Sequence, residues 1–304
     1  MSFQDLPEEL ILKVLSYSEP IDLITSGQVS KRFRTISHDS SLWQRVNLSK
    51  KVVKTEFLEV ILSKGCKSLN LSESTIINSF SIYQNSQLRE LDLSGVEDVE
   101  ASEEILASCY FLEKLKMLWT LTPKMAVSIC QNCKTLQILD LFATMGDADS
   151  HLHIIECCQE LKEVTLPLNH VLTDLSDDDL EFLANNIPPN VEKLKMSNLY
   201  VTDDHIKILL NRCNKVKALH LGTTLITDES MRNIRENLNN TLEELSLCYG
   251  DNISSIGILE LKSMSRLKLL NLETFANDKD EEIESLRHQL PYLMIASYPD
   301  HYLY

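Results

Sequence analysis

Glycine and proline are scarce in this chain of 304 residues, with 7 and 8 copies. Long flexible linkers and disordered tracts are usually rich in these residues, so none is expected. Basic residues are outnumbered as well: the formal net charge is −16, and no block rich in Lys or Arg offsets it. A nucleic acid or an anionic membrane attracts a basic face, so neither is an expected partner.

Long apolar runs are also missing. Nowhere do about 18 apolar residues follow one another, so no membrane-spanning helix is expected. The first ten residues, MSFQDLPEEL, lack the basic start and apolar stretch of a signal peptide. Without such a signal, the eight cysteines are expected to be free thiols in a reducing compartment, and the chain is expected in the cytoplasm or nucleus.

Groups of residues that carry chemistry are absent too. The sequence shows no nucleophile–base pair, no glycine-rich phosphate loop and no cluster of metal ligands. We therefore predict a binding protein rather than an enzyme, and we expect no cofactor.

The feature that dominates the sequence is an internal repeat. The segment LRELDLS at 88–94 has the pattern LxxLxL, and the same frame recurs along the chain, for example in LQILDLF at 136–142 and LEELSLC at 242–248. We call the second apolar position of each copy its anchor; the anchors are Val46, Leu69, Leu91, Leu115, Leu139, Val164, Leu194, Leu219, Leu245, Leu270 and Leu293. Successive anchors lie 22 to 26 residues apart, except for one step of 30 between Val164 and Leu194. This spacing is typical of leucine-rich repeats.

The fold class follows from the pattern. Alternation in LxL is strand periodicity, so the leucines point inward and the residues between them outward. The rest of each repeat is long enough for a helix of about ten residues and two short loops, and segments such as HIKILLNRC at 205–213 have apolar residues at helical spacing. The sequence therefore predicts an α/β fold in which a curved solenoid covers residues 46–295, with a parallel sheet on the concave face and helices on the convex face.

Four cysteines occupy equivalent places in this repeat. Cys109, Cys133, Cys158 and Cys213 each lie six residues before the anchor, as in the cysteine-containing class of leucine-rich repeats. We interpret them as buried thiols that fill the corner between helix and strand, since free cysteine packs as a small hydrophobic residue. The alternative is a zinc site built from Cys130-x-x-Cys133 and Cys157-Cys158, which we disfavour because a second Cys-x-x-Cys pair is missing.

Residues 1–45 do not follow the repeat. DLPEELILKVL predicts a helix with Asp5 as its cap, a second short helix begins at Pro20, and a third follows in SKRFRTI. Three short helices are marginal for folding alone, so this unit should need the solenoid or a partner to cover its apolar surface.

Three separated blocks in this unit resemble an F-box: LPEELILKVLSY, the VSKRF stretch, and SLWQRVNL. Phe33 stands where that motif often has Trp, so an aromatic residue is kept. An F-box followed by cysteine-type repeats is similar to the arrangement of the F-box/leucine-rich-repeat family. The resemblance implies a small three-helix F-box that docks on the Skp adaptor of an SCF (Skp–cullin–F-box) ubiquitin ligase, and through it on cullin and a RING protein.

The resemblance also implies which residues contact the adaptor. Carried over by position, they are Leu6, Pro7, Leu10, Leu15, Val29 and Phe33. Internal packing of the three helices is an alternative role for some of them, and for Leu10 and Val29 the two roles are equally supported. Leu6 and Pro7 are expected at an exposed lip.

A protein substrate would bind the concave face. Apolar and aromatic residues stand on or beside that otherwise polar face at Leu118, Trp119, Ile138 and Phe142, and such exposed clusters often mark interaction sites. Lysines flank them, and the predicted substrate-binding residues are Lys114, Lys116, Leu118, Trp119, Phe142, Lys195 and His220. A basic spot in an acidic protein suits an acidic or phosphorylated substrate.

Alternatives remain open for these residues. The lysines could simply pair with Glu90, Asp92, Asp140 and Glu163 on neighbouring strands. Trp119 could lie under the following loop. The step of 30 residues predicts an extra loop near 168–176, and Asp177, Asp178 and Asp179 after it suit a helix start better than a calcium site. Residues 296–304 form a tail that could cap the last repeat.

Two other functions compete with a ligase receptor. A leucine-rich regulator of a small GTPase would act through its solenoid without the first unit. A structural scaffold would bind the adaptor but deliver no substrate.

Overall fold

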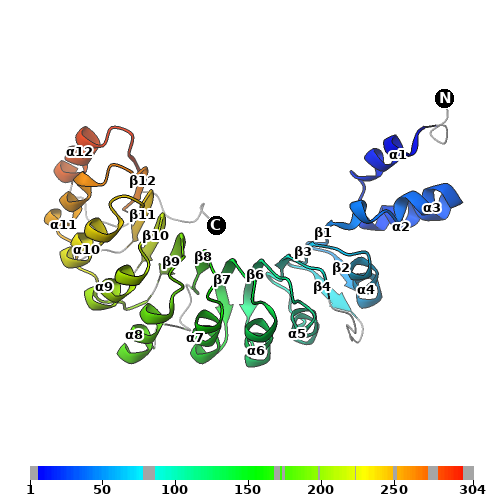
Figure 1. Ribbon diagram of the computed structural model, residues 1–304, viewed down its shortest axis with the longest axis horizontal. Coiled ribbons are helices and arrows are strands. Elements are labelled where there is room, and N and C mark those ends of the chain that lie inside the picture. The colour runs from blue at the N-terminus through cyan, green and yellow to red at the C-terminus, as the bar shows by residue number, and fades with distance from the viewer. Residues whose placement is uncertain are drawn as a thin grey trace. The chain divides into compact units, whose positions relative to one another are not determined.

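Figure 1 shows a computed structural model of the chain. The residues that it describes are 6–77, 86–167, 172, 175–197, 199–222, 224–248, 252–272 and 280–296. The chain divides into two compact units. The first contains Met1–Thr120 and Val127–Leu136, and the second contains Leu121–Ala126 and Gln137–Tyr304.

The first unit begins with short helices. They are α1 (Glu8–Leu15), α2 (Pro20–Val29), α3 (Lys31–Ser37) and the 3₁₀ helix η2 (Ser40–Trp43). Pro20 occupies the first turn of α2, where a missing N–H costs nothing. Ser30 ends α2 and caps α3, because its hydroxyl accepts a hydrogen bond from the Phe33 N–H at 3.2 Å. Asp5, the predicted cap of α1, lies outside the described residues, and Pro7 stands at the N-cap position.

The first repeats belong to the same unit. Their sheet contains β1 (Arg45–Asn47), β3 (Ser68–Asn70), β5 (Glu90–Asp92) and β6 (Lys114–Thr120), in that order and all parallel. A second, two-stranded sheet pairs β2 (Val52–Lys54) with β4 (Thr75–Ile77). The helices are α4 (Thr55–Ser63), α5 (Val99–Ala107) and α6 (Pro123–Asn132), of which α6 also contributes its first residues to the second unit.

The second unit continues the alternation of strand and helix (Figure 1). Its strands are β7 (Ile138–Met145), β8 (Glu163–Thr165), β9 (Lys193–Ser197), β10 (Ala218–Gly222), β11 (Glu244–Cys248), β12 (Leu269–Asn271) and β13 (Met294–Ala296). Its helices are α7 (Ala148–Cys157), α8 (Asp177–Asn186), α9 (Asp203–Arg212), α10 (Asp228–Leu238), α11 (Ser255–Glu260), the 3₁₀ helix η4 (Leu261–Ser263) and α12 (Asp280–Gln289).

The anchors set the register of the sheet. Leu69 pairs with Val46 on one side and Leu91 on the other, and Leu219 pairs with Leu194 and Leu245 in the same way. All of these anchors are buried, so each repeat covers its apolar residues with its neighbours. The fold is thus the predicted α/β leucine-rich-repeat solenoid. We call the sheet surface opposite the helices the strand face.

The last repeat departs from the predicted frame. The sequence pattern makes Leu293 the final anchor, but the residue opposite Leu270 is Ile295. The prediction for Leu293 is therefore wrong by two residues. A slip of two leaves the same side chains pointing inward, so the hydrophobic pattern alone does not prevent it.

The cysteines before the anchors are buried, as predicted. Cys109, Cys133, Cys158 and Cys213 lie in the corner between helix and strand with almost no exposed surface. Burial raises the pKa of both Cys109 and Cys213 to about 11, so these thiols stay protonated near neutral pH.

Helix length bears on membranes as well. Among the described residues, no helix combines the length and apolar character needed to cross a bilayer.

Candidate functional site

Large apolar side chains are exposed on α1, on α2 and in the turn between them, and we call them together the apolar stripe. The large hydrophobic side chains exposed here are Leu10, Val14, Tyr17, Ile21, Ile24 and Val29. Leu10 and Val14 are four residues apart, and Ile21 and Ile24 are three apart, so each pair lies on one helix face. Each helix also buries a second apolar set, including Ile11 and Leu15 on α1 and Leu23 on α2. Helices of a solvated unit usually keep their outer face polar, so the stripe indicates a docking surface.

The structure separates the predicted adaptor contacts into two groups. Leu10 and Val29 are 51% and 67% exposed, which excludes internal packing as their role in the free chain. Leu15 and Phe33 are 4% and 7% exposed, so their side chains pack inside the helical unit. Pro7 is exposed and Leu6 is half-buried beside it.

The chain before α1 is tied to α3. The Arg32 Nη2 donates a hydrogen bond to the Leu6 carbonyl at 2.7 Å, and the Pro7 carbonyl accepts from the N–H groups of Leu10 and Ile11 at 3.1 Å each. Leu6 and Pro7 are therefore held in place before any partner arrives. A substitution at Leu6 or Pro7 would therefore affect the start of α1 as well as docking.

Val14, Tyr17, Ile21 and Ile24 were not among the predicted contacts. Their signal in the sequence is helical spacing on the face opposite the buried stripe. The sequence pattern alone does not say which of two apolar faces is covered, because that depends on where the neighbouring helices pack.

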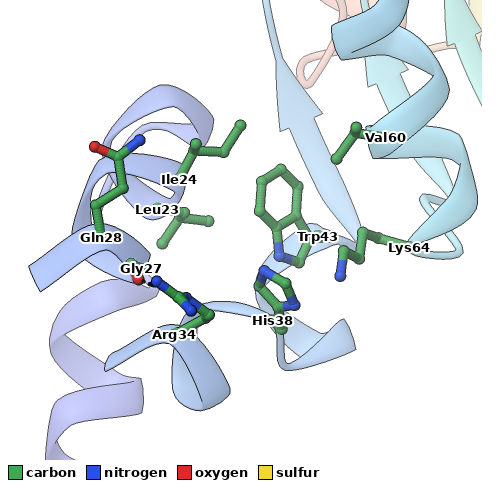
Figure 2. A pocket seen from close by; sticks show the side chains of 9 residues that line it. All are labelled: Leu23, Ile24, Gly27, Gln28, Arg34, His38, Trp43, Val60 and Lys64. Carbon is green, nitrogen blue, oxygen red and sulfur yellow. Dashed lines mark hydrogen bonds between the residues drawn. The ribbon is translucent and has the colours of Figure 1, made fainter. Parts of the chain in front are cut away.

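A pocket opens between this helical unit and the first repeat (Figure 2). It has a volume of about 120 Å³. Its walls come from α2, α3, η2 and α4, and the lining residues are Leu23, Ile24, Gly27, Gln28, Arg34, His38, Trp43, Val60 and Lys64. Ile24 belongs both to the pocket and to the apolar stripe.

On the strand face of the first unit, opposite charges stand in register. Lys114 pairs with Glu90, and Lys116 pairs with Asp92, on the adjacent strands β6 and β5. Lys114 is exposed and Lys116 is half-buried. The register fits the alternative that these lysines balance neighbouring acids as well as it fits substrate binding.

Leu118 and Trp119 lie further along β6. Leu118 is half-buried, whereas Trp119 is 55% exposed and does not lie under the following loop. Trp119 also has a φ of 91°, a left-handed conformation that is strained for a residue with a bulky side chain. Phe142 and Ile138 belong to the second unit, where both are half-buried on β7.

The other two predicted substrate residues lie on neighbouring strands of the second unit. Lys195 on β9 is paired in register with His220 on β10. His220 is buried, and its Nε2 lies 2.8 Å from Glu244 Oε1 on β11. This contact with His220 is the main reason why the pKa of Glu244 lies below its usual value, and Lys193 and Lys195 lower it further. His220 therefore holds Glu244 and is little exposed to a partner.

Asp177, Asp178 and Asp179, which follow the step of 30 residues, lie in the first turn of α8. Ser176 and Asp179 form a capping box at α8, in which the Asp179 carboxylate accepts from the Ser176 N–H at 3.0 Å. These hydrogen bonds lower the pKa of Asp179. Most of the predicted loop at 168–176 lies outside the described residues, as does the tail beyond 296.

Comparison with known proteins decides what the helical unit is. Residues 3–49 match the family described as F-box-like. Residues 3–49 therefore form an F-box-like domain, and leucine-rich repeats follow it. The match begins and ends within a few residues of the three-helix unit, so the F-box and the short helices are the same feature.

The fold also matches a solved structure. A chain in the crystal structure of the Rad7 and Elc1 complex in yeast has a TM-score of 0.56 with this protein. The alignment covers 96% of this chain and 87% of that one, at 16% sequence identity. At this identity the match shows a shared fold along almost the whole chain.

Proposed function

We propose that this chain is the substrate-recognition subunit of an SCF-type ubiquitin ligase. Its F-box docks on the Skp adaptor, which links it to cullin and a RING protein, and its strand face binds the protein to be ubiquitinated. The chain itself acts by binding, in the cytoplasm or nucleus, and carries no catalytic residue.

One observation carries the proposal: an F-box-like domain presents an exposed apolar stripe on α1 and α2. Apolar anchors on helices dominate this kind of interface. The yeast relative in fold was crystallised as a complex of two proteins, and a binding role for this chain agrees with that.

Adaptor binding tests the first half of the proposal. The double variant Leu10→Glu with Val29→Glu introduces charge at two exposed positions, so it should fold normally yet lose co-purification with the Skp adaptor. Val52→Glu, at a residue 70% exposed on β2 of the same unit, is the matched control and should bind normally. Adaptor binding by the double variant at the wild-type level would refute the assignment of the stripe.

Substrate capture tests the second half. A chain without its F-box should retain substrates on the repeats and prevent their degradation. Affinity proteomics with this variant should therefore identify them. A protein that accumulates when the whole chain is lost, and equally when only Leu10 and Val29 are replaced, supports a ligase receptor. Accumulation on loss of the whole chain but not in the double variant would favour a scaffold or a small-GTPase regulator that acts without ubiquitin transfer.

A further inference from the structure

The pocket beside the F-box combines an apolar wall with basic groups. Leu23, Ile24, Trp43 and Val60 supply the apolar part, and Arg34, His38 and Lys64 supply the basic part. Figure 2 shows that these side chains come from both sides of the same pocket, with Val60 on α4 and Lys64 directly after that helix. No Asp or Glu lines it.

The arginine is positioned by the fold. Its Nε donates a hydrogen bond to the Gly27 carbonyl at 3.1 Å, which leaves the two terminal nitrogens of the guanidinium for another acceptor (Figure 2). Gly27 makes this possible because α2 and α3 approach closely there: a Cβ at residue 27 would lie 2.9 Å from Ser37 Oγ. Little side-chain freedom remains for Arg34 to lose on binding an anion.

The aromatic wall is fixed as well. Trp43 is 1% exposed, and its Nε1 donates to the Ser37 carbonyl at 2.8 Å. Its one polar atom is thus satisfied inside the protein, and the buried ring forms a fixed apolar base beneath the pocket.

Among the described residues, no carboxylate lies within 4.0 Å of Arg34, His38 or Lys64. Some other basic residues of this unit do have one: Arg89 is paired with Glu113, and Lys51 with Glu19. In a chain with a net charge of −16, two cationic side chains, Arg34 and Lys64, that line one pocket without an acid favour an anion there.

We propose that this pocket binds a small organic anion: a carboxylate or phosphate ester attached to one compact apolar group. The anion contacts Arg34 and Lys64, and the apolar group lies against Ile24 and Val60, the exposed apolar residues of the lining. A cavity of roughly 150 Å³ accommodates benzene, so a pocket of about 120 Å³ with an open mouth fits a single ring or a branched aliphatic group.

The test uses the full chain and three defined probes: benzoate, phenyl phosphate and the neutral benzamide. Titration by ligand-observed NMR should show saturable binding of at least one anion, with benzamide weaker by about tenfold because it lacks the charge. The affinities for benzoate and phenyl phosphate together show whether the pocket prefers a carboxylate or a phosphate ester. Equal binding of benzamide, or no saturable binding of either anion, would overturn the proposal.

Variants locate the binding to this pocket. Lys64→Met keeps the apolar stem and removes the charge, and Arg34→Met does the same on α3; each should weaken anion binding by about tenfold. Lys67→Met, at an exposed lysine outside the pocket, is the control and should change nothing. If Arg34→Met disturbs the fold, Lys64→Met decides alone, and wild-type binding by Lys64→Met would refute the site.

A last titration distinguishes a small molecule from a partner segment. Because Ile24 belongs to both surfaces, purified Skp adaptor is added to the chain loaded with probe. Retention of the probe supports a small-molecule site. Displacement at one adaptor per chain would overturn it and assign the pocket to the adaptor interface. If the adaptor did not bind the chain at all, the proposed function would be disproved, and the assignment of the pocket would stay intact.

Discussion

The carboxylate of Asp203, at the start of α9, accepts a hydrogen bond from the backbone N–H of Ser230 in the next repeat at 3.0 Å. The same carboxylate accepts from the Thr227 N–H at 2.9 Å and from the hydroxyls of Thr227 and Ser230. One acidic side chain therefore caps the following helix, α10, across the repeat boundary. Asp228 does the same for the next helix, accepting from the Ser254 N–H at 2.7 Å.

Removing this contact should destabilise the second unit. Asp203→Ala leaves two backbone N–H groups and two hydroxyls at the start of α10 without their acceptor, which should lower the free energy of unfolding by about 2–3 kcal/mol. Urea unfolding followed by circular dichroism measures this. Asp204→Ala, at the exposed neighbour in the same helical turn, is the control and should cost less than about 0.5 kcal/mol. Equal effects of the two substitutions would contradict the role of Asp203.

The contribution of Asp203 should also depend on pH. Burial by itself raises the pKa of this carboxyl, but the hydrogen bonds from Ser230 and Thr227 outweigh it and hold the pKa below its usual value. A group with a lowered folded-state pKa stabilises fully above its unfolded pKa, about 3.9, and loses that contribution as pH falls through the folded value. The difference in unfolding free energy between wild type and Asp203→Ala should therefore be larger at pH 6 than at pH 3. A difference that is the same at both pH values would argue against an ionised Asp203.

The thiols should differ strongly in reactivity. Burial raises the pKa of Cys66 to about 12 and that of Cys109 to about 11, whereas Cys157 on α7 is only half-buried. With iodoacetamide at pH 8, Cys157 should be alkylated first, and Cys66 and Cys109 only after unfolding. Peptide mass spectrometry resolves the order, and denatured protein, in which all thiols should react alike, provides the control. Early labelling of Cys109 would mean that the helix-to-strand corner opens readily.

The backbone conformation of Trp119 should lower the stability of the folded chain. Its φ of 91° suits glycine, so Trp119→Gly should be more stable than Trp119→Ala, which keeps the strain, by about 1 kcal/mol. Urea unfolding of the two variants gives the comparison. If Trp119→Ala were the more stable of the two, strain at this position would be negligible.

The same residue tests the predicted substrate surface. Trp119→Ala and Phe142→Ala should each weaken capture of a substrate found by affinity proteomics, measured as its dissociation constant from the purified chain. Val127→Ala, at an exposed residue of α6, is the control. Unchanged capture in both variants would place the substrate elsewhere on the strand face.

Much of the repeat array could be read from the leucines. An LxL step specifies a strand and its inward side, and a recurring step specifies which strands are neighbours, so the pairing of Leu69 with Leu91 or Leu194 with Leu219 was predictable. The end of the array was not. The β13 strand has no described strand beyond it, so only β12 sets its register, and the choice between Leu293 and Ile295 depended on contacts rather than pattern.

The helical unit shows a different limit. Short helices were visible in the sequence, and so was their likeness to an F-box. Which face is buried was not, and Leu15 and Phe33 are inside while Leu10 and Val29 are outside. The distinction arises from the close crossing of α2 and α3 at Gly27 and from the position of Trp43, both of which are three-dimensional properties.

The sequence by itself thus determined the class of the protein: repeat length, inward leucines, buried cysteines and an F-box-like start, all properties of local periodicity. Only the tertiary structure decided the surfaces. Arg34, His38 and Lys64 meet Trp43 because three helices and the first repeat pack together, although these residues lie on separate elements with their own local patterns. In the repeats, local patterns specify which side chains are buried, but the side chains that remain exposed come together only through packing between distant segments.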